Sequence, residues 1–227
     1  VLTSGTPVIN GGNLDGYRVS GGQISIGGNG LDTSASDYTA ILARSVAANA
    51  GIWAQQLQVG TGSQAYAADG SGQGTVAASG PAPAFALDVA ALGGMYAGNI
   101  VLVGTEHGLG VRNAGKLVAG AGGLRLQADG QLLNSGTLGA TDAAADVQLQ
   151  TGAVSNDGTL SSARNLQLDS SGPLSNQGTL SAARQLTLNA TQLDNNSSGA
   201  IDAQRLAITT ATLSNSGQLR QSGSQAL

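Results

Sequence analysis

The heptapeptide LSNQGTL at residues 174–180 has two near copies upstream, VSNDGTL at 154–160 and LNSGTL at 133–138. Each copy sets an apolar residue, an asparagine, a glycine and a second apolar residue in the same order. The asparagine recurs at intervals of 21, 22, 20, 19 and 20 residues, at Asn113, Asn134, Asn156, Asn176, Asn195 and Asn215. The glycines that follow are Gly115, Gly136, Gly158, Gly178, Gly199 and Gly217. A period of this length indicates repeats that pack only on their neighbours.

A second apolar pattern lies between successive asparagines. It reads GLRLQ at 123–127, DVQLQ at 146–150, NLQLD at 165–169, QLTLN at 185–189 and RLAIT at 205–209. Alternation with a period of two is typical of a short strand with one buried face. We therefore expect two interior columns, one of Leu166, Leu186 and Leu206 and one of Leu168, Leu188 and Ile208.

Several short strands per repeat predict an all-β solenoid, a right-handed parallel β-helix, with about five or six coils over residues 110–219. The pattern of leucine-rich repeats is absent, and the intervals are not the multiples of six that a left-handed hexapeptide helix needs. Stacked asparagine amides are expected to form hydrogen-bonded ladders along the axis. The glycines would serve either a positive φ or a close approach of two backbones.

The first half of the chain has a different character. All six aromatic residues lie within the first 96 positions, and residues 60–84 show no period and are rich in Gly, Ala and Ser. This stretch is expected to leave the coil as a loop or hairpin. We divide the chain into residues 1–109 and a repeat region at 110–227.

Composition excludes several classes of function. The net charge of −4 removes the electrostatic basis for binding nucleic acid, and the absence of cysteine excludes a disulfide framework or a thiolate metal site. The glycine-rich loops lack the GxGxxG and GK[ST] patterns of nucleotide sites, and no calcium-binding repeat occurs. We expect no metal, no cofactor and no nucleic-acid partner.

Few residues are candidates for chemistry. His107, the only histidine, lies beside Glu106, but neither has a second catalytic group placed by spacing, so a structural or solvent-facing role is favoured. Trp53 is expected to lie in the core or to cover an extra-helical element, with stacking on a sugar as the alternative. Arg164, Arg184 and Arg205 each follow a repeat glycine by six residues. They predict an outer column, either a stripe for an anionic glycan or partner or a solvated face that discourages aggregation.

Three strings resemble the secretion domain of two-partner-secretion exoproteins, the filamentous haemagglutinin and CdiA-like family. They are TPVINGGNLDGYRVSGGQISIGGNGLD at 6–32, DYTAILARSVAANAGIWAQQLQV at 37–59 and ALGGMYAGNIVLVGTEHGLGVRNAG at 91–115. The repeats from residue 110 onward are similar to the haemagglutinin-type repeats that follow that domain. The family's domain begins with a longer segment carrying Asn-Pro-Asn motifs, which are absent here. The resemblance therefore makes residues 1–109 the C-terminal part of the domain.

The resemblance implies a non-enzymatic structural and secretion module of a large exoprotein, either an adhesin or the stalk of a contact-dependent-inhibition toxin. It implies an outer-membrane two-partner transporter as partner, and a host or bacterial surface receptor as a further one. The exoprotein would cross the periplasm and outer membrane and be secreted or displayed on the cell surface. The alternative is an adhesin segment that binds host glycan or protein directly. A β-helical polysaccharide lyase or hydrolase is disfavoured, because charged residues make up only 10% of the chain.

Overall fold

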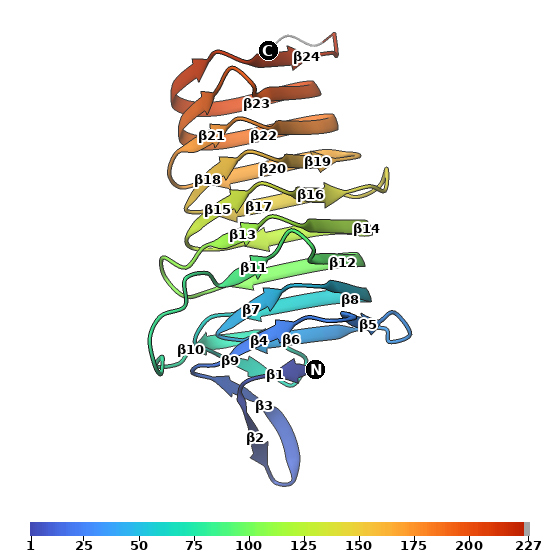
Figure 1. The fold of residues 1–227 in the computed structure, drawn as a ribbon, viewed down its shortest axis with the longest axis vertical. Helices are drawn as coiled ribbons and strands as arrows, with labels where there is room; N and C mark the ends of the chain where they lie inside the picture. The colour runs from blue at the N-terminus through green and yellow to red at the C-terminus, as the bar shows by residue number, and fades with distance from the viewer. Residues whose placement is uncertain (225–227) are drawn as a thin grey trace.

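The computed structural model describes residues 1–224, and all of its regular structure is β. Twenty strands form one continuous sheet wound into a right-handed parallel β-helix of about nine turns, shown upright in Figure 1. These strands are β1 (Leu2–Thr3), β4 (Gln23–Ile26), β5 (Leu31–Thr33), β6 (Thr39–Ala43), β7 (Ser45–Ala48), β8 (Gly51–Thr61), β11 (Leu87–Val89), β12 (Gly94–Gly104), β13 (Val111–Asn113), β14 (Lys116–Gln127), β15 (Gln131–Asn134), β16 (Thr137–Ala140), β17 (Val147–Thr151), β18 (Ala153–Asn156), β19 (Thr159–Ser162), β20 (Asn165–Ser170), β21 (Leu174–Asn176), β22 (Thr179–Asn195), β23 (Ala200–Asn215) and β24 (Gln218–Gln221). The predicted fold class is confirmed.

One coil of the regular part contains three strands. In the coil that starts at β15, the strands β15, β16 and β17 pair in parallel with β18, β19 and β20 of the next coil. In the last coils the separate strands merge into the long, bent β22 and β23. The position of the repeat asparagine can be followed through nine coils, at Ile26, Ala48, Val89, Asn113, Asn134, Asn156, Asn176, Asn195 and Asn215.

The interior of the coil is a single apolar core that runs from Ile41 to Leu206. Both predicted columns are confirmed. Leu186 is in register with Leu166 and Leu206, and Leu188 is in register with Leu168 and Ile208. Alternation along each strand turns these side chains inward, and stacking on the coils above and below buries all of them except Ile208, which is partly buried.

The predicted extra-helical hairpin is present, but its boundaries differ from those expected. Residues 60 and 61 still belong to β8, and the hairpin consists of β9 (Gln64–Ala67) and β10 (Gly72–Thr75). It also does not stand alone. A second hairpin, β2 (Thr6–Asn10) and β3 (Asn13–Val19), pairs with it to form a four-stranded antiparallel sheet in the order β10-β9-β3-β2.

This small sheet is attached to the outside of the coil by its own apolar cluster. Val19 and Tyr66 of the sheet pack on Ala40 and Leu42, the outward-facing residues of β6, with Tyr17 at the edge. The hydroxyl of Tyr66 is buried, and this burial raises its pKa. All five residues of β6 are therefore buried, because one face lines the coil and the other is covered by the sheet.

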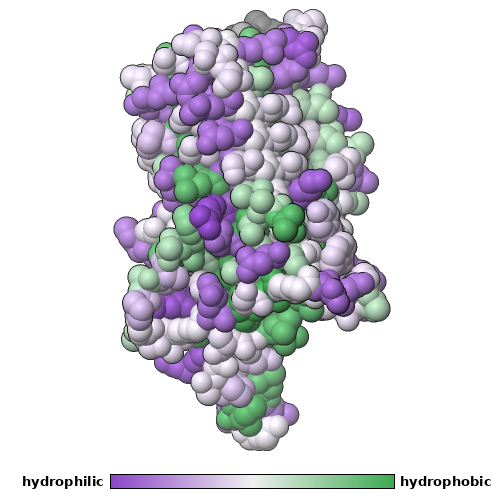
Figure 2. Space-filling view, viewed as in Figure 1, coloured by the Kyte–Doolittle hydropathy of each residue, from purple (hydrophilic) through white to green (hydrophobic). Residues whose placement is uncertain are grey.

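The two ends of the molecule have different surfaces. The β2–β3 hairpin projects below the first coils in Figure 1. In Figure 2 it is largely apolar, whereas hydrophilic residues dominate the surface of the last coils. Between residues 1 and 224 there is no helix of the length and apolar character that a membrane crossing requires.

Candidate functional site

The repeat asparagines form a continuous ladder inside one corner of the coil. In each step the Nδ2 of one asparagine donates to the Oδ1 of the next, over 2.8, 2.7, 2.8, 2.8 and 2.7 Å from Asn113 to Asn215. Each donor amide also reaches backbone carbonyls at the same corner, as Asn156 does with Gly158 and Thr179. Because all donors point toward the C-terminus, each coil fixes the position of the next one.

The ladder begins with an unpaired atom. The Oδ1 of Asn113 is buried and accepts no hydrogen bond in the structure. The residue in register with Asn113 on the preceding coil is Val89, which offers no donor from its side chain. At the other end, Asn215 is exposed. Asn113 therefore marks the boundary between an apolar column and an amide column.

The repeat glycines are explained by close packing and not by backbone conformation. None of the six has a positive φ, and all lie within the described residues. A Cβ on Gly136, Gly158 or Gly178 would overlap the carbonyl oxygen of the repeat glycine one coil before it. Gly199 differs in detail, because its Cβ would meet the Oδ1 of Asn195. Of the two roles left open by the sequence, the structure selects the close approach of backbones.

The three arginines expected in one column are staggered. The backbone N–H of Arg184 donates to the carbonyl of Arg164 over 2.8 Å, so these two stack. Arg205 is in register with Gln185 instead. The physical reason is that the segment from Gly199 to Leu206 is one residue shorter than the segment from Gly178 to Leu186, while both leucines stay in register.

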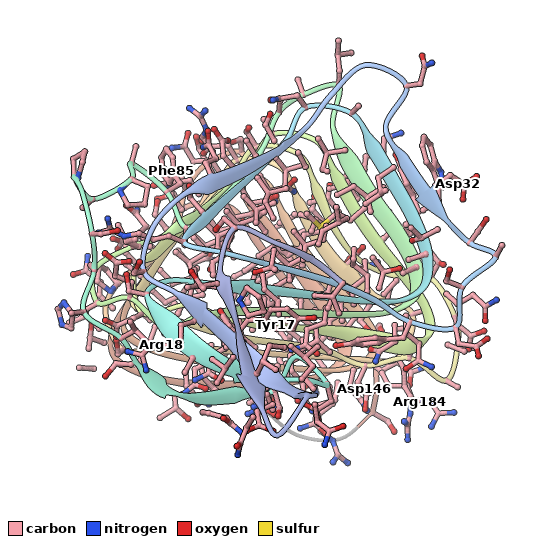
Figure 3. All side chains as sticks on the ribbon, turned by 90° about the horizontal axis from the view of Figure 1, so that it is seen from below. Tyr17, Arg18, Asp32, Phe85, Asp146 and Arg184 are labelled. Atoms are coloured by element: carbon pink, nitrogen blue, oxygen red, sulfur yellow. The ribbon has the colours of Figure 1, made fainter. Side chains whose placement is uncertain are left out.

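Arg184 and Arg205 line a shallow groove of about 770 Å³ on the outer corner. Arg164 is held by Asp146, with Nη1 3.5 Å from Oδ2. Figure 3, a view along the axis, places Asp146 and Arg184 at the same rim of the coil. The groove carries two cations over two coils, and its other lining residues are small or uncharged.

Glu106 and His107 do not form a pair. The carboxylate of Glu106 accepts two bonds from Arg44, 2.7 Å from Nη2 and 3.0 Å from Nε. The imidazole of His107 is 99% exposed and lies 3.7 Å from Asp129. Glu106 and His107 are therefore not arranged as an acid and base that act together.

Arg44 fastens the extra-helical segment to the coil while its guanidinium is paired with Glu106. The side chain of Arg44 is buried, and its Nη1 also donates to the carbonyls of Ser79, Gly80 and Pro81, over 2.9, 3.1 and 3.0 Å. The bonds from Arg44 lower the pKa of Glu106. We call this group the arginine clamp, because one side chain holds a loop and a coil together.

Sequence reasoning missed the clamp and the β2–β3 hairpin. The hairpin had a signal, since Gly11 and Gly12 separate two apolar runs, and both have positive φ in the structure. The clamp had only a weak signal, a charged residue inside the apolar run YTAILARSV at 38–46. Its partners lie 35 to 62 residues away, and no local pattern connects them.

The sequence matches the family model of the TPS secretion domain over residues 1–134. It also matches the haemagglutinin repeat over residues 121–178 and 142–224. Since the first match covers more than half of the chain, the chain belongs to the TPS secretion domain family.

Curated relatives carry the name CdiA. The chain is 50% identical over 138 residues to "Toxin CdiA" of Yersinia pestis, covering 60% of this chain and 4% of the relative. It is 46% identical over 136 residues to "tRNA nuclease CdiA-2" of Burkholderia pseudomallei, with 60% and 4% covered. For "Toxin CdiA" of Escherichia coli the identity is 38% over 194 residues, with 75% and 6% covered. The chain thus spans only 4 to 6% of the length of these relatives.

Among solved structures, the chain is similar to the crystal structure of the filamentous hemagglutinin secretion domain. The sequence identity is 20% and the TM-score 0.44, with 95% of this chain and 56% of that chain covered.

Proposed function

We propose that this chain is a non-enzymatic module for the secretion and extension of a large CdiA-like exoprotein. Residues 1–109 would belong to the part that an outer-membrane transporter of the two-partner pathway recognises, and residues 110–227 would begin the stalk. The exoprotein would pass through the periplasm and outer membrane and be displayed at the cell surface. Membership of the TPS secretion domain family and the similarity to CdiA proteins support this proposal.

The directional asparagine ladder carries the mechanical part of the proposal. A coil that has formed offers its amide donors, its backbone edge and its apolar column to the residues that follow. Folding can therefore advance by one coil at a time from the N-terminal side, as expected of a solenoid with nearest-neighbour energetics. Each added coil on the outer side would oppose the return of the chain through a narrow pore.

The stalk assignment is favoured over that of a toxin or an enzyme for this part of the exoprotein. The functional groups found here hold coils together, and at the outer corner Arg184 and Arg205 are exposed while Arg164 is half-buried beside Asp146. We propose that Arg164, Arg184 and Arg205 keep this edge hydrated and discourage side-by-side association of filaments.

The test is a secretion experiment with the parent exoprotein in its own host cell. An antibody against residues 110–227 would detect surface display in cells with and without the transporter encoded beside the exoprotein gene. We expect the surface signal to disappear without the transporter while the protein remains detectable inside the cell. Undiminished display without the transporter would refute the proposed export route.

A further inference from the structure

Two aromatic side chains lie next to each other on the outside of the coil. Trp53 on β8 and Tyr96 on β12 are in register on adjacent coils. Their ring centroids are 6.1 Å apart and their planes differ by 14°. Trp53 is 40% exposed, so this pair lies on the surface and does not fill the core.

Both rings rest on glycine. A Cβ on Gly51 would overlap the six-membered ring of Trp53, and a Cβ on Gly94 would lie 2.8 to 3.0 Å from three atoms of the Tyr96 side chain. A Cβ on Gly30, the residue before β5, would also lie 2.9 Å from the Trp53 ring. Each ring therefore lies down over the glycine two residues before it, an arrangement that any larger residue would prevent.

The ring pair leaves aromatic surface uncovered. Fully overlapping rings would have centroids about 3.5 to 4 Å apart, the optimal separation of carbon atoms. At 6.1 Å and 14° the rings are stacked with an offset, so each covers only part of the other. Because one side of each ring faces a glycine, the other side faces away from the strand. The result is a flat aromatic platform, defined here as Trp53 and Tyr96 on their glycine floor.

The rim of the platform carries one charge of each sign, beside the apolar Val118 of β14, which is in register with Tyr96. Asp32 of β5 is in register with Trp53 on one side, and hydrogen bonds from Ser34 lower the pKa of its carboxyl. Lys116 of β14 is in register with Gly94 on the other side. Figure 3 shows Asp32 on the side of the coil opposite Arg18 of the extra-helical sheet, so the sheet does not cover this rim.

Hydroxyl groups continue the surface beyond the platform. The column that contains Gly94 and Lys116 goes on to Thr137, Thr159 and Thr179 on the following coils. A long ligand that lies along the axis would thus leave the aromatic rings and meet the hydroxyl of a half-buried threonine at each of these coils.

We propose that the aromatic platform binds a neutral β-1,4-linked oligosaccharide of gluco configuration, which lies along the axis of the coil. In such sugars the substituents are equatorial and the faces carry axial C–H groups, which suit a flat aromatic surface. Neighbouring sugars of such a chain could each place one face on a ring, because neighbouring coils each supply one ring. A single carboxylate and a single ammonium at the rim favour hydroxyl groups over a charged polymer. This inference does not depend on the proposed export route.

The chain provides its own probe, because Trp53 is its only tryptophan. We would titrate the full chain with chitotetraose and with cellotetraose and record the tryptophan emission. Stacking of a sugar on Trp53 should change the intensity or shift the emission maximum in a saturable way with at least one of the two. An unchanged emission with both at millimolar concentrations would overturn the proposal.

Variants then locate the binding by calorimetry. Trp53→Ala and Tyr96→Ala should each weaken binding about tenfold, the change that corresponds to the loss of one stacking contact. Trp53→Phe keeps a ring and should retain most of the affinity, which separates stacking from a general loss of structure. Leu92→Ala is the matched control, since Leu92 is 91% exposed and lies outside the platform. Binding that survives both alanine variants, or that falls equally with Leu92→Ala, would overturn the assignment of the site.

Discussion

The coils before Asn113 and the coils after it are built on the same core but are held together differently. After Asn113, each coil repeats the same amide bond to the next coil, and all but the coil of Gly199 repeat the same glycine contact. Before Asn113, the ladder position holds Ile26, Ala48 and Val89, which bring only apolar contact. The comparison shows that a parallel coil can form without the asparagine ladder. Where the ladder is present, its hydrogen bonds fix the register between coils in the same way in every repeat.

The first coils obtain their register from contacts between distant parts of the chain. The arginine clamp joins Arg44 to residues 79–81 and 106, and the small sheet covers β6 through Val19 and Tyr66. Within residues 1–224 each of these contacts is made by one pair of segments, and it fixes one arrangement of that pair. We therefore expect damage to remain within neighbouring coils in the repeat region, and to spread over long sequence distances in the first half.

The largest effect is expected from a charge in the repeat core. Leu186→Asp would bury an unpaired carboxylate between Leu166 and Leu206, at a cost of about 4 kcal/mol or more. Gln185→Asp, one residue away on the outer face, should change the stability by about 0.5 kcal/mol. Hydrogen exchange should show faster exchange in the coils next to residue 186 and little change in residues 1–96. Equal effects of the two variants would mean that the register is wrong.

The next largest effect is expected at the clamp. Arg44→Ala leaves Glu106 without its partner and frees three carbonyls, and should lower the free energy of unfolding by about 3 kcal/mol. The loop at residues 76–84 should then become the first site of proteolysis. Arg164→Ala, which removes a half-buried arginine at 3.5 Å from Asp146, is the control and should cost about 0.5 kcal/mol. Slow cleavage of the loop in Arg44→Ala would show that the small sheet holds it without the clamp.

Two substitutions in the ladder test the boundary between the two regions. Asn156→Val leaves the buried Oδ1 of Asn176 without a donor and should cost about 2 kcal/mol. Asn113→Val leaves the Oδ1 of Asn134 without a donor, but it also removes the Oδ1 of Asn113, which is already unpaired. The variant should therefore cost only about 1 kcal/mol. Chemical denaturation of both variants measures the difference. A larger loss from Asn113→Val would show that the first rung is the more important one.

The smallest effect is a dependence on pH. Arg44 holds the pKa of Glu106 below its usual range, so the unfolded carboxyl binds protons at a higher pH than the folded one. The stabilisation is therefore complete above the unfolded pKa of about 4.3 and is lost as the pH falls through the folded pKa. Hydrogen exchange of β9 and β10 between about pH 6 and about pH 3 should show them loosening in acid. Glu106→Gln should flatten this dependence, and an unchanged pH profile in that variant would place its origin elsewhere.

The sequence alone determined the coil, since its evidence is local and repeated. The same register between coils is indicated by the alternating leucines, by the 20-residue period and by the recurring asparagine. The spacing was therefore enough to predict the interior columns that contain Leu186 and Leu188. The stretch at residues 60–84 was recognisable as a departure from the coil because it lacks that period. Its starting point was misplaced because β8 continues to Thr61 before the chain leaves.

Tertiary structure alone decided the features that occur once. The bonds from Arg44 to Pro81 and to Glu106, the cover of β6 by Tyr66 and the pairing of β3 with β9 join residues 24 to 62 positions apart. The offset of Arg205 from Arg184 was also visible only in the folded structure. It arises because one coil has one residue fewer before its leucine, while the leucines stay in register. A repeat period predicts which residues of successive coils lie in register, because each coil packs on its neighbour in the same way. A single contact across the chain has no repetition to reveal it, and only the folded backbone brings its partners together.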